Sequence, residues 1–216
     1  MAGENMVNKY FYKNLPYIFI SIGTVIIIYS AFSLIKAKYE QQVLMEEHKY
    51  LTVEKEADNL CHVPTEEVSI EAEEEKTARE DYKNGMMTIA IPKIHINAAV
   101  MEGTTKELLK KGPGLYEISP LPDQDGSNVC IAGHRTTYGA WFGKVDKLKE
   151  NDEIVLNYND VEYLYRVEKV FIVDKKDWWI TEPAEDSVIT LTSCHPPKSS
   201  KQRIVVRGKL EKVSKS

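Results

Sequence analysis

Three residues in the second half of the chain carry side chains that together could perform acyl transfer. Cys194 ends a β-like segment, Arg203 begins the next one nine residues later, and His134 follows a third such segment at 128–132. A thiolate can act as a nucleophile, an imidazole can carry a proton, and a guanidinium can donate hydrogen bonds to a developing oxyanion. Because strand ends can meet at one edge of a sheet, we expect these side chains to converge on one pocket.

The segments that must position these residues have the pattern of short strands. From residue 86 onward, apolar and β-branched runs are separated by Gly, Pro, Asn and Asp, which is typical of strands joined by turns. Many short strands without a βαβ rhythm predict an all-β, closed or nearly closed barrel of about 130 residues. We expect strands at 87–91, 94–101, 128–132, 153–158, 161–173, 187–193 and 202–210, and short helices at 105–111 and 139–148.

A long apolar run precedes the barrel. Residues 15–35 contain 21 residues without a charge, enough to span a bilayer as a helix. A cleaved signal peptide is the rival interpretation, but its apolar region is usually shorter and ends in a small-x-small site. We therefore expect a single uncleaved transmembrane helix, with residues 1–14 as a cytoplasmic tail. Lysine counts on the two sides are nearly balanced, so the positive-inside rule says little about orientation.

Charge is unevenly distributed along the remainder. Residues 40–81 carry 14 acidic and 4 basic residues, whereas residues 83–216 carry 18 acidic and 20 basic residues. We therefore expect an acidic stalk at 36–82 and a nearly neutral catalytic domain at 83–216. Neither part has the dense basic patch that binding to nucleic acid requires.

The three cysteines do not predict a disulfide framework or a metal site. Cys61, Cys130 and Cys194 are scattered, and no CxxC pair or Cys/His cluster has zinc-like spacing. Cys130 is expected to be a buried core thiol. We expect no metal and no cofactor.

Three short motifs resemble the signature elements of one enzyme family. Ala132-Gly133-His134-Arg135, Thr190-Leu191-Thr192-Ser193-Cys194 and Arg203 look like those of sortases, the membrane-anchored cysteine transpeptidases of Gram-positive bacteria. The match covers roughly residues 87–211. Ser193 replaces the usual threonine before the cysteine and keeps a hydroxyl there.

The resemblance implies a fold and a reaction. The fold would be a closed, eight-stranded β-barrel with two or three short helices and the active site at one end. Cys194 would be the nucleophile, His134 the general acid/base and Arg203 the donor to the substrate carbonyl and oxyanion. The family cleaves a C-terminal LPXTG-like sorting signal of surface proteins between Thr and Gly. It then passes the acyl group from a thioacyl enzyme to an amine of a peptidoglycan precursor or pilin. Such an enzyme acts outside the cytoplasm, at the cell membrane.

The subgroup and the substrate pocket follow less directly from the sequence. The strings Gly133 to Ala140 and Cys194-His195-Pro196 resemble class D and class E sortases, which tend to prefer LPXTG-like and LAXTG signals respectively, so the second residue of the signal stays open. Tyr138, Tyr116 and Trp178 are candidate substrate-binding residues, with packing roles as the alternative.

Two other functions remain open. A sortase-like cysteine protease would mainly hydrolyse its peptide, and a membrane-tethered barrel could bind peptide without reacting. Because His precedes Cys in the chain, a papain-like arrangement does not fit.

Overall fold

The computed structural model describes residues 4–59, 79 and 82–215 of the chain. The chain forms two compact units, one up to residue 36 and one from residue 37 onward. Cys61 and residues 60–78 and 80–81 of the expected acidic stalk lie outside the described residues.

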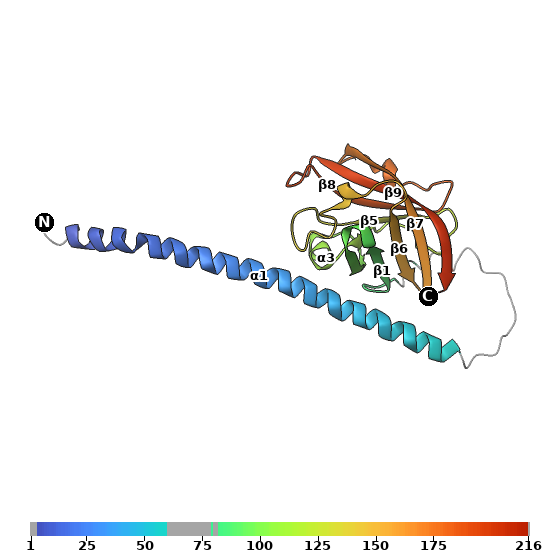
Figure 1. Ribbon diagram of the computed structural model, residues 1–216, viewed down its shortest axis with the longest axis horizontal. Coiled ribbons are helices and arrows are strands. Elements are labelled where there is room, and N and C mark those ends of the chain that lie inside the picture. Colours follow the sequence, from blue (N-terminus) through green and yellow to red (C-terminus); the bar gives the residue numbers. More distant parts are fainter. Residues whose placement is uncertain (1–3, 60–78, 80–81, 216) are drawn as a thin grey trace. The chain divides into compact units, whose positions relative to one another are not determined.

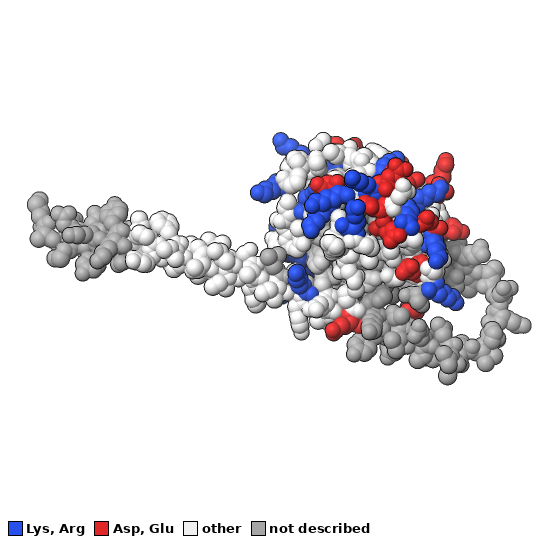
Figure 2. Space-filling model, in the orientation of Figure 1, with Lys and Arg blue, Asp and Glu red and all other residues white. Residues whose placement is uncertain are grey.

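Helix α1 spans Glu4–Asn59 and contains the whole apolar run at 15–35. The large apolar side chains along this run are exposed: Ile20 by 62%, Ile27 by 69% and Phe32 by 64%. Figure 2 shows the same stretch of helix without acidic or basic side chains, while both signs of charge intermingle on the visible face of the barrel. In the described part of the chain, one helix is long and apolar enough to cross a membrane.

The second unit is built around one mixed sheet that curls into a nearly closed barrel (Figure 1). The strands are β1 (Met87–Ile91), β2 (Ile96–Ala99), β3 (Met101–Glu102), β4 (Gly114–Leu115), β5 (Asn128–Ala132), β6 (Glu153–Tyr158), β7 (Val161–Asp174), β8 (Val188–His195) and β9 (Gln202–Lys215). Their order is β2-β1-β6-β7-β9-β8-β5-β4-β3. The edge strands β2 and β3 are consecutive in the chain and separated only by Val100.

The strand count is nine rather than the eight expected. The difference arises because two strands, β3 and β4, contain only two residues each and pair with each other in parallel. Such short ladders carry no alternating hydrophobic pattern. The expected strand at 94–101 is also divided, because Pro92 begins a 3₁₀ turn, η1 (Pro92–Ile94), and His95 adopts a left-handed conformation before β2 starts.

Alternating side chains of the strands fill the barrel. Ile189 and Leu191 of β8 and Ile204 and Val206 of β9 belong to the main core cluster, while Val205 belongs to a second cluster with Val173 and Ile180. Alternate residues of a strand point to opposite faces. Thr190, Thr192 and Cys194 therefore lie on the face of β8 opposite to the main core cluster, where Thr190 and Thr192 are nevertheless buried.

Short helical segments connect the strands. Helix α3 (Lys106–Lys111) begins at Thr105, whose side chain accepts a hydrogen bond from the backbone N–H of Leu108. Two further connections contain the 3₁₀ turns η2 (Val145–Lys147) and η3 (Trp178–Thr181).

The prediction of a helix at 139–148 is wrong. Tyr138, Gly139 and Ala140 have positive φ angles of 48°, 85° and 45°. Three left-handed residues in succession are incompatible with an α-helix.

Candidate active site

Parallel pairing between β5 and β8 brings His134 and Cys194 to the same end of the barrel. Ala132 is the register partner of Thr192, so His134 and Cys194 each follow that rung by two residues. The backbone N–H of Gly133 donates to the carbonyl of Thr192 over 3.0 Å, which extends the pairing beyond the strand. The equal offset explains why residues sixty positions apart in sequence meet here.

Cys194 and Arg203 are direct partners in the antiparallel β8–β9 ladder. Directly opposite residues in such a ladder present their side chains on the same face of the sheet. The Arg203 guanidinium Nη1 currently donates to the backbone carbonyls of Ser200, at 3.2 Å, and Gln202, at 3.1 Å. Both bonds are exposed; Ser200 lies in the turn between the two strands, and Gln202 is the first residue of β9.

A cavity of about 360 Å³ opens at this end of the barrel. Cys194 and His134 both line this cavity. The other lining residues are Arg135, Thr136, Thr137, Lys198, Ser199 and Ser200. The structure therefore brings two of the three expected catalytic residues into one cavity. Arg203 is placed beside that cavity by register and by its bond to Ser200, but does not line it.

The surroundings of His134 favour a neutral imidazole. Partial burial lowers its pKa from the ordinary value, and the positive charges of Lys106 and Lys110 on α3 act in the same direction. Its Nε2 atom is buried without a hydrogen-bond partner among the described residues. Because His134 lines the same cavity as Cys194, a neutral imidazole at this position is suited to exchange protons with a bound substrate.

Backbone and hydroxyl contacts fix the segment that carries His134. The Ser193 hydroxyl donates a hydrogen bond to the carbonyl of Gly133 over 2.7 Å. Since Ser193 precedes Cys194 and Gly133 precedes His134, this bond links the two segments that carry the catalytic candidates. A Cβ at Gly133 would lie 2.6 Å from the ring of Phe142, which explains the requirement for glycine. The Phe142 N–H in turn donates to the carbonyl of His134 at 3.0 Å.

Arg135 braces the same loop, a role that the sequence analysis missed. Its side chain is only 3% exposed, forms an ion pair with Asp146 over 2.9 Å, and donates to the carbonyl of Phe142 over 2.9 Å. The position of Arg135 next to His134 was visible in the sequence. Its partners were not, because nothing in the intervening residues indicates that the loop folds back on itself.

The three candidate substrate-binding residues lie on two sides of the site. The Tyr138 ring is 5.5 Å from the His134 ring, and the Lys110 ammonium lies 5.1 Å from the Tyr138 centroid. On the β8 face, the hydroxyl groups of Tyr116 and Thr192 are 2.9 Å apart. Trp178 packs edge-on against Tyr116 at 6.4 Å and remains 60% exposed.

The other described cysteine is in a different environment. Cys130 is fully buried, its thiol contacts the carbonyl of Asn128 at 3.2 Å, and burial raises its pKa to about 12. Such a thiol is unreactive at neutral pH. Among the described residues, no group of three His, Cys, Asp or Glu side chains could hold a metal ion.

Comparison with known proteins agrees with this architecture. Residues 89–211 match the sequence profile of the sortase domain. The chain is 29% identical to Sortase D of Bacillus subtilis (strain 168) over 202 residues, which cover 91% of this chain and 98% of that protein. The crystal structure of Sortase E1 from Streptomyces coelicolor, at 26% identity, superposes with a TM-score of 0.57 over 60% of this chain and 89% of the other.

A Sortase D5 transpeptidase from Clostridium perfringens has the same fold, with a TM-score of 0.62 over 81% of this chain and 99% of that chain, at 24% identity. The barrel, the strand-end thiol and these matches define a cysteine transpeptidase. The chain belongs to the sortase family, and its relatives include class D and class E members, as the motifs predicted.

Proposed function

We propose that Cys194, His134 and Arg203 are the catalytic residues of a membrane-anchored sortase that joins surface proteins to the cell wall. The substrate is a C-terminal LPXTG- or LAXTG-like sorting signal, cleaved between Thr and Gly. The acceptor is an amine of a peptidoglycan precursor or pilin. The observation that carries this proposal is the shared cavity of Cys194 and His134, with Arg203 opposite the thiol in the ladder.

The first half of the reaction forms a thioester. The Cys194 thiolate attacks the carbonyl carbon of the substrate Thr, and the carbonyl oxygen takes the negative charge. Arg203 exchanges its bonds to the Ser200 and Gln202 carbonyls for bonds to that oxyanion. Protonated His134 donates its proton to the departing Gly amine, the C–N bond breaks, and the acyl group remains on sulfur.

The second half transfers the acyl group. The acceptor amine attacks the thioester carbon, and neutral His134 takes a proton from the amine. The C–S bond breaks, which restores the Cys194 thiolate beside a protonated imidazole. His134 is neutral at the start of this half because it has given its proton to the leaving amine, and its lowered pKa, caused first by burial, favours that neutral form until the acceptor arrives.

The aromatic residues beside the cavity define a substrate path. Tyr116 and Trp178 cover the face of β8 that leads to Cys194, since Tyr116 contacts Thr192, two residues before the thiol. We assign this face to the sorting signal and the opposite side, near Tyr138, to the loop that carries His134. Burial raises the pKa of Tyr116, so its phenol stays neutral and able to hydrogen-bond.

The apolar helix supports a position at the cell membrane. Residues 15–35 would cross the bilayer once, with residues 1–14 in the cytoplasm and the catalytic domain at 83–216 outside. Exposed Ile and Phe side chains along this run favour a lipid environment, because an isolated helix of this kind would expose a large apolar surface to water. Residues 36–82 would then connect membrane and catalytic domain.

Peptide assays on the full chain in detergent micelles separate the three candidate functions. Fluorogenic LPXTG and LAXTG peptides are incubated with and without a primary amine. Transpeptidation predicts an amide product that requires the amine and disappears in Cys194→Ala. Equal turnover without amine would identify a protease, and binding without turnover would identify a peptide-binding barrel.

A further inference from the structure

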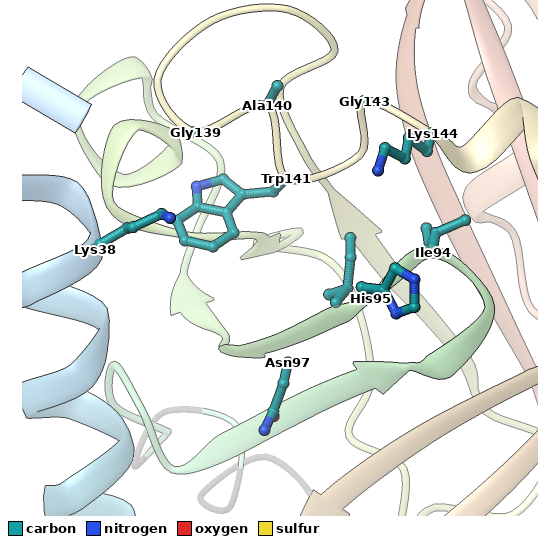
Figure 3. A pocket seen from close by; sticks show the side chains of 10 residues that line it. Lys38, Ile94, His95, Asn97, Gly139, Ala140, Trp141, Gly143 and Lys144 are labelled. Carbon is teal, nitrogen blue, oxygen red and sulfur yellow. The ribbon is translucent and has the colours of Figure 1, made fainter. Parts of the chain in front are cut away.

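A second cavity lies outside the candidate active site. Its volume is about 620 Å³, compared with about 360 Å³ for the cavity that contains Cys194. Side chains from α1, from the β1–β2 connection and from the loop after His134 surround it (Figure 3). The lining consists of Lys38, Ile94, His95, Ile96, Asn97, Gly139, Ala140, Trp141, Gly143 and Lys144.

Small residues keep this cavity open. Gly139, Ala140 and Gly143 contribute at most a methyl group to its wall, and the backbone at Gly139 and Ala140 has positive φ angles. Ile94, which also lines the cavity, is buried. The wall formed by the loop after His134 therefore leaves room that larger side chains would occupy.

The charged groups around the cavity are all basic. Lys38 extends from α1 toward the ring of Trp141, and Lys144 and His95 lie on the other side (Figure 3). Asn97 adds an amide that can both donate and accept. Among the described residues, no Asp or Glu lines the cavity. Two ammonium groups and an amide without a competing carboxylate form a site for an anion, and phosphate is the anion that lysine commonly binds.

The position of Lys38 in the chain indicates where such an anion would come from. Lys38 follows Ile35, the last residue of the apolar run, by three residues. Three residues reach at most about 11 Å, whatever the direction of the chain. If residues 15–35 cross the bilayer, Lys38 lies at the level of the lipid head groups, where Trp is also enriched. Basic side chains next to a membrane-spanning helix attract anionic head groups on the cytoplasmic side, and the same electrostatic attraction acts wherever the outer surface carries anionic lipid.

We propose that this cavity binds the phosphate of an anionic membrane lipid, with Lys38 and Lys144 as the cationic contacts and Trp141 beside the glycerol region. This inference rests on the membrane attachment proposed above. The bound head group would hold the barrel at the membrane surface by a second point besides the helix. The residues that line this cavity also belong to the loop that follows His134. Within that loop, the N–H of Phe142 donates to the carbonyl of His134, and the N–H of Ala140 donates to the carbonyl of Thr137.

The test titrates phosphatidylglycerol into the full chain in maltoside micelles and counts bound lipid by native mass spectrometry. Lys38→Gln/Lys144→Gln should weaken binding about thirtyfold, since each lysine near a lipid surface contributes about a factor of five. The matched control Lys147→Gln/Lys149→Gln removes the same charge outside the cavity and should bind like the wild type. Equal weakening in both pairs would overturn the proposal.

A second variant separates the cavity from charge alone. Asn97 is an exposed residue of β2, so Asn97→Trp would fill the cavity and leave both lysines in place. Loss of phosphatidylglycerol binding in this variant supports the cavity as the site, and unchanged binding would overturn it. Glycerol phosphate without lipid tests the source of the phosphate: binding as tight as that of phosphatidylglycerol would identify a soluble ligand and contradict the lipid assignment.

Activity assays on the same preparations distinguish this proposal from the proposed function. If only the lipid site is wrong, wild-type protein cleaves the sorting peptide but binds phosphatidylglycerol no better than the double lysine variant. If only the catalytic assignment is wrong, lipid binding depends on Lys38 and Lys144, but no peptide product forms. If the membrane attachment is wrong, the wild-type chain is recovered outside phosphatidylcholine nanodiscs, which overturns the lipid proposal as well.

Discussion

Cys194 and Arg203 stand directly opposite each other in the β8–β9 ladder, although eight residues separate them in the chain. The pairing fixes the guanidinium on the same face as the thiol. The guanidinium now donates exposed hydrogen bonds to the backbone carbonyls of Ser200 and Gln202. A substrate carbonyl could therefore replace them without leaving a buried group unpaired.

Replacement of Arg203 by lysine should lower kcat/KM about a hundredfold, which is typical for the loss of one oxyanion donor. Lysine keeps the charge but cannot reproduce the planar fork of donors. Arg166→Lys, on β7 at an exposed ion pair with Glu153 and Glu211, provides the matched control and should keep wild-type turnover. Near-wild-type kcat/KM in Arg203→Lys would contradict the assigned role.

The two described thiols should differ strongly in reactivity. Iodoacetamide should label Cys194, which lines an open cavity, and spare Cys130, which is buried and has a pKa raised to about 12. Peptide mapping after brief labelling of the native protein checks this. Cys130→Ser and Cys61→Ser should keep activity. Labelling of Cys130 at the rate of Cys194 would show that the barrel is more open there than the structure indicates.

The Ser193 hydroxyl should matter for both stability and rate. Ser193→Ala leaves the carbonyl of Gly133 without its 2.7 Å donor and should lower the free energy of unfolding by about 1 kcal/mol. It should also lower turnover, because Gly133 precedes His134. Ser193→Thr retains the hydroxyl, matches the residue usual in sortases and should behave like the wild type. Urea unfolding and peptide turnover measure the two effects, and equal behaviour of Ala and Thr variants would refute the coupling.

The ion pair of Arg135 should contribute to the stability of the His134 loop. Asp146→Ala would leave a guanidinium that is 3% exposed without its anionic partner, at a cost of about 2 kcal/mol in the free energy of unfolding. Asp186→Ala, which breaks the exposed pair with Lys209, serves as the comparison and should cost less than about 1 kcal/mol. Similar losses in urea melts would show that Arg135 does not brace the loop.

The titration of His134 should respond to the lysines of α3. Partial burial lowers the pKa of His134 most, and Lys106 and Lys110 lower it further, because each positive charge disfavours the imidazolium. Lys106→Gln removes one such charge, so the pKa of His134 should rise and the imidazolium should persist to higher pH. NMR titration of the imidazole protons measures the change, with Lys147→Gln as a control. A pKa that falls or stays fixed in Lys106→Gln would contradict this electrostatic arrangement.

The sequence predicted those strands and helices whose apolar residues follow a regular local pattern. The strands that carry Cys194 and precede His134 have alternating or continuous apolar residues, and their ends were found within two residues. The apolar run at 15–35 was equally plain, and the structure extends it into one helix. The motif around Cys194 then indicated the family, which the domain match confirmed.

Other parts depend on contacts that local patterns do not encode. The loop after His134 was expected to be helical, but left-handed residues at Tyr138 and Ala140 and the clamp of Arg135 on Asp146 shape it instead. Likewise, nothing in the sequence placed Tyr116 against Thr192, since that contact depends on how β4 pairs with β5. The cavity beside Lys38 is of the same kind, formed by segments far apart in the chain.

Direct detection of the acyl intermediate tests the central claim. The full chain in micelles is mixed with a sorting peptide in the absence of amine, quenched in acid, digested and analysed by mass spectrometry. We predict an adduct on Cys194 whose mass corresponds to the peptide truncated after Thr, and its loss on addition of an amine. Peptide cleavage without any adduct on Cys194, or an adduct on another residue, would contradict the assignment of the nucleophile.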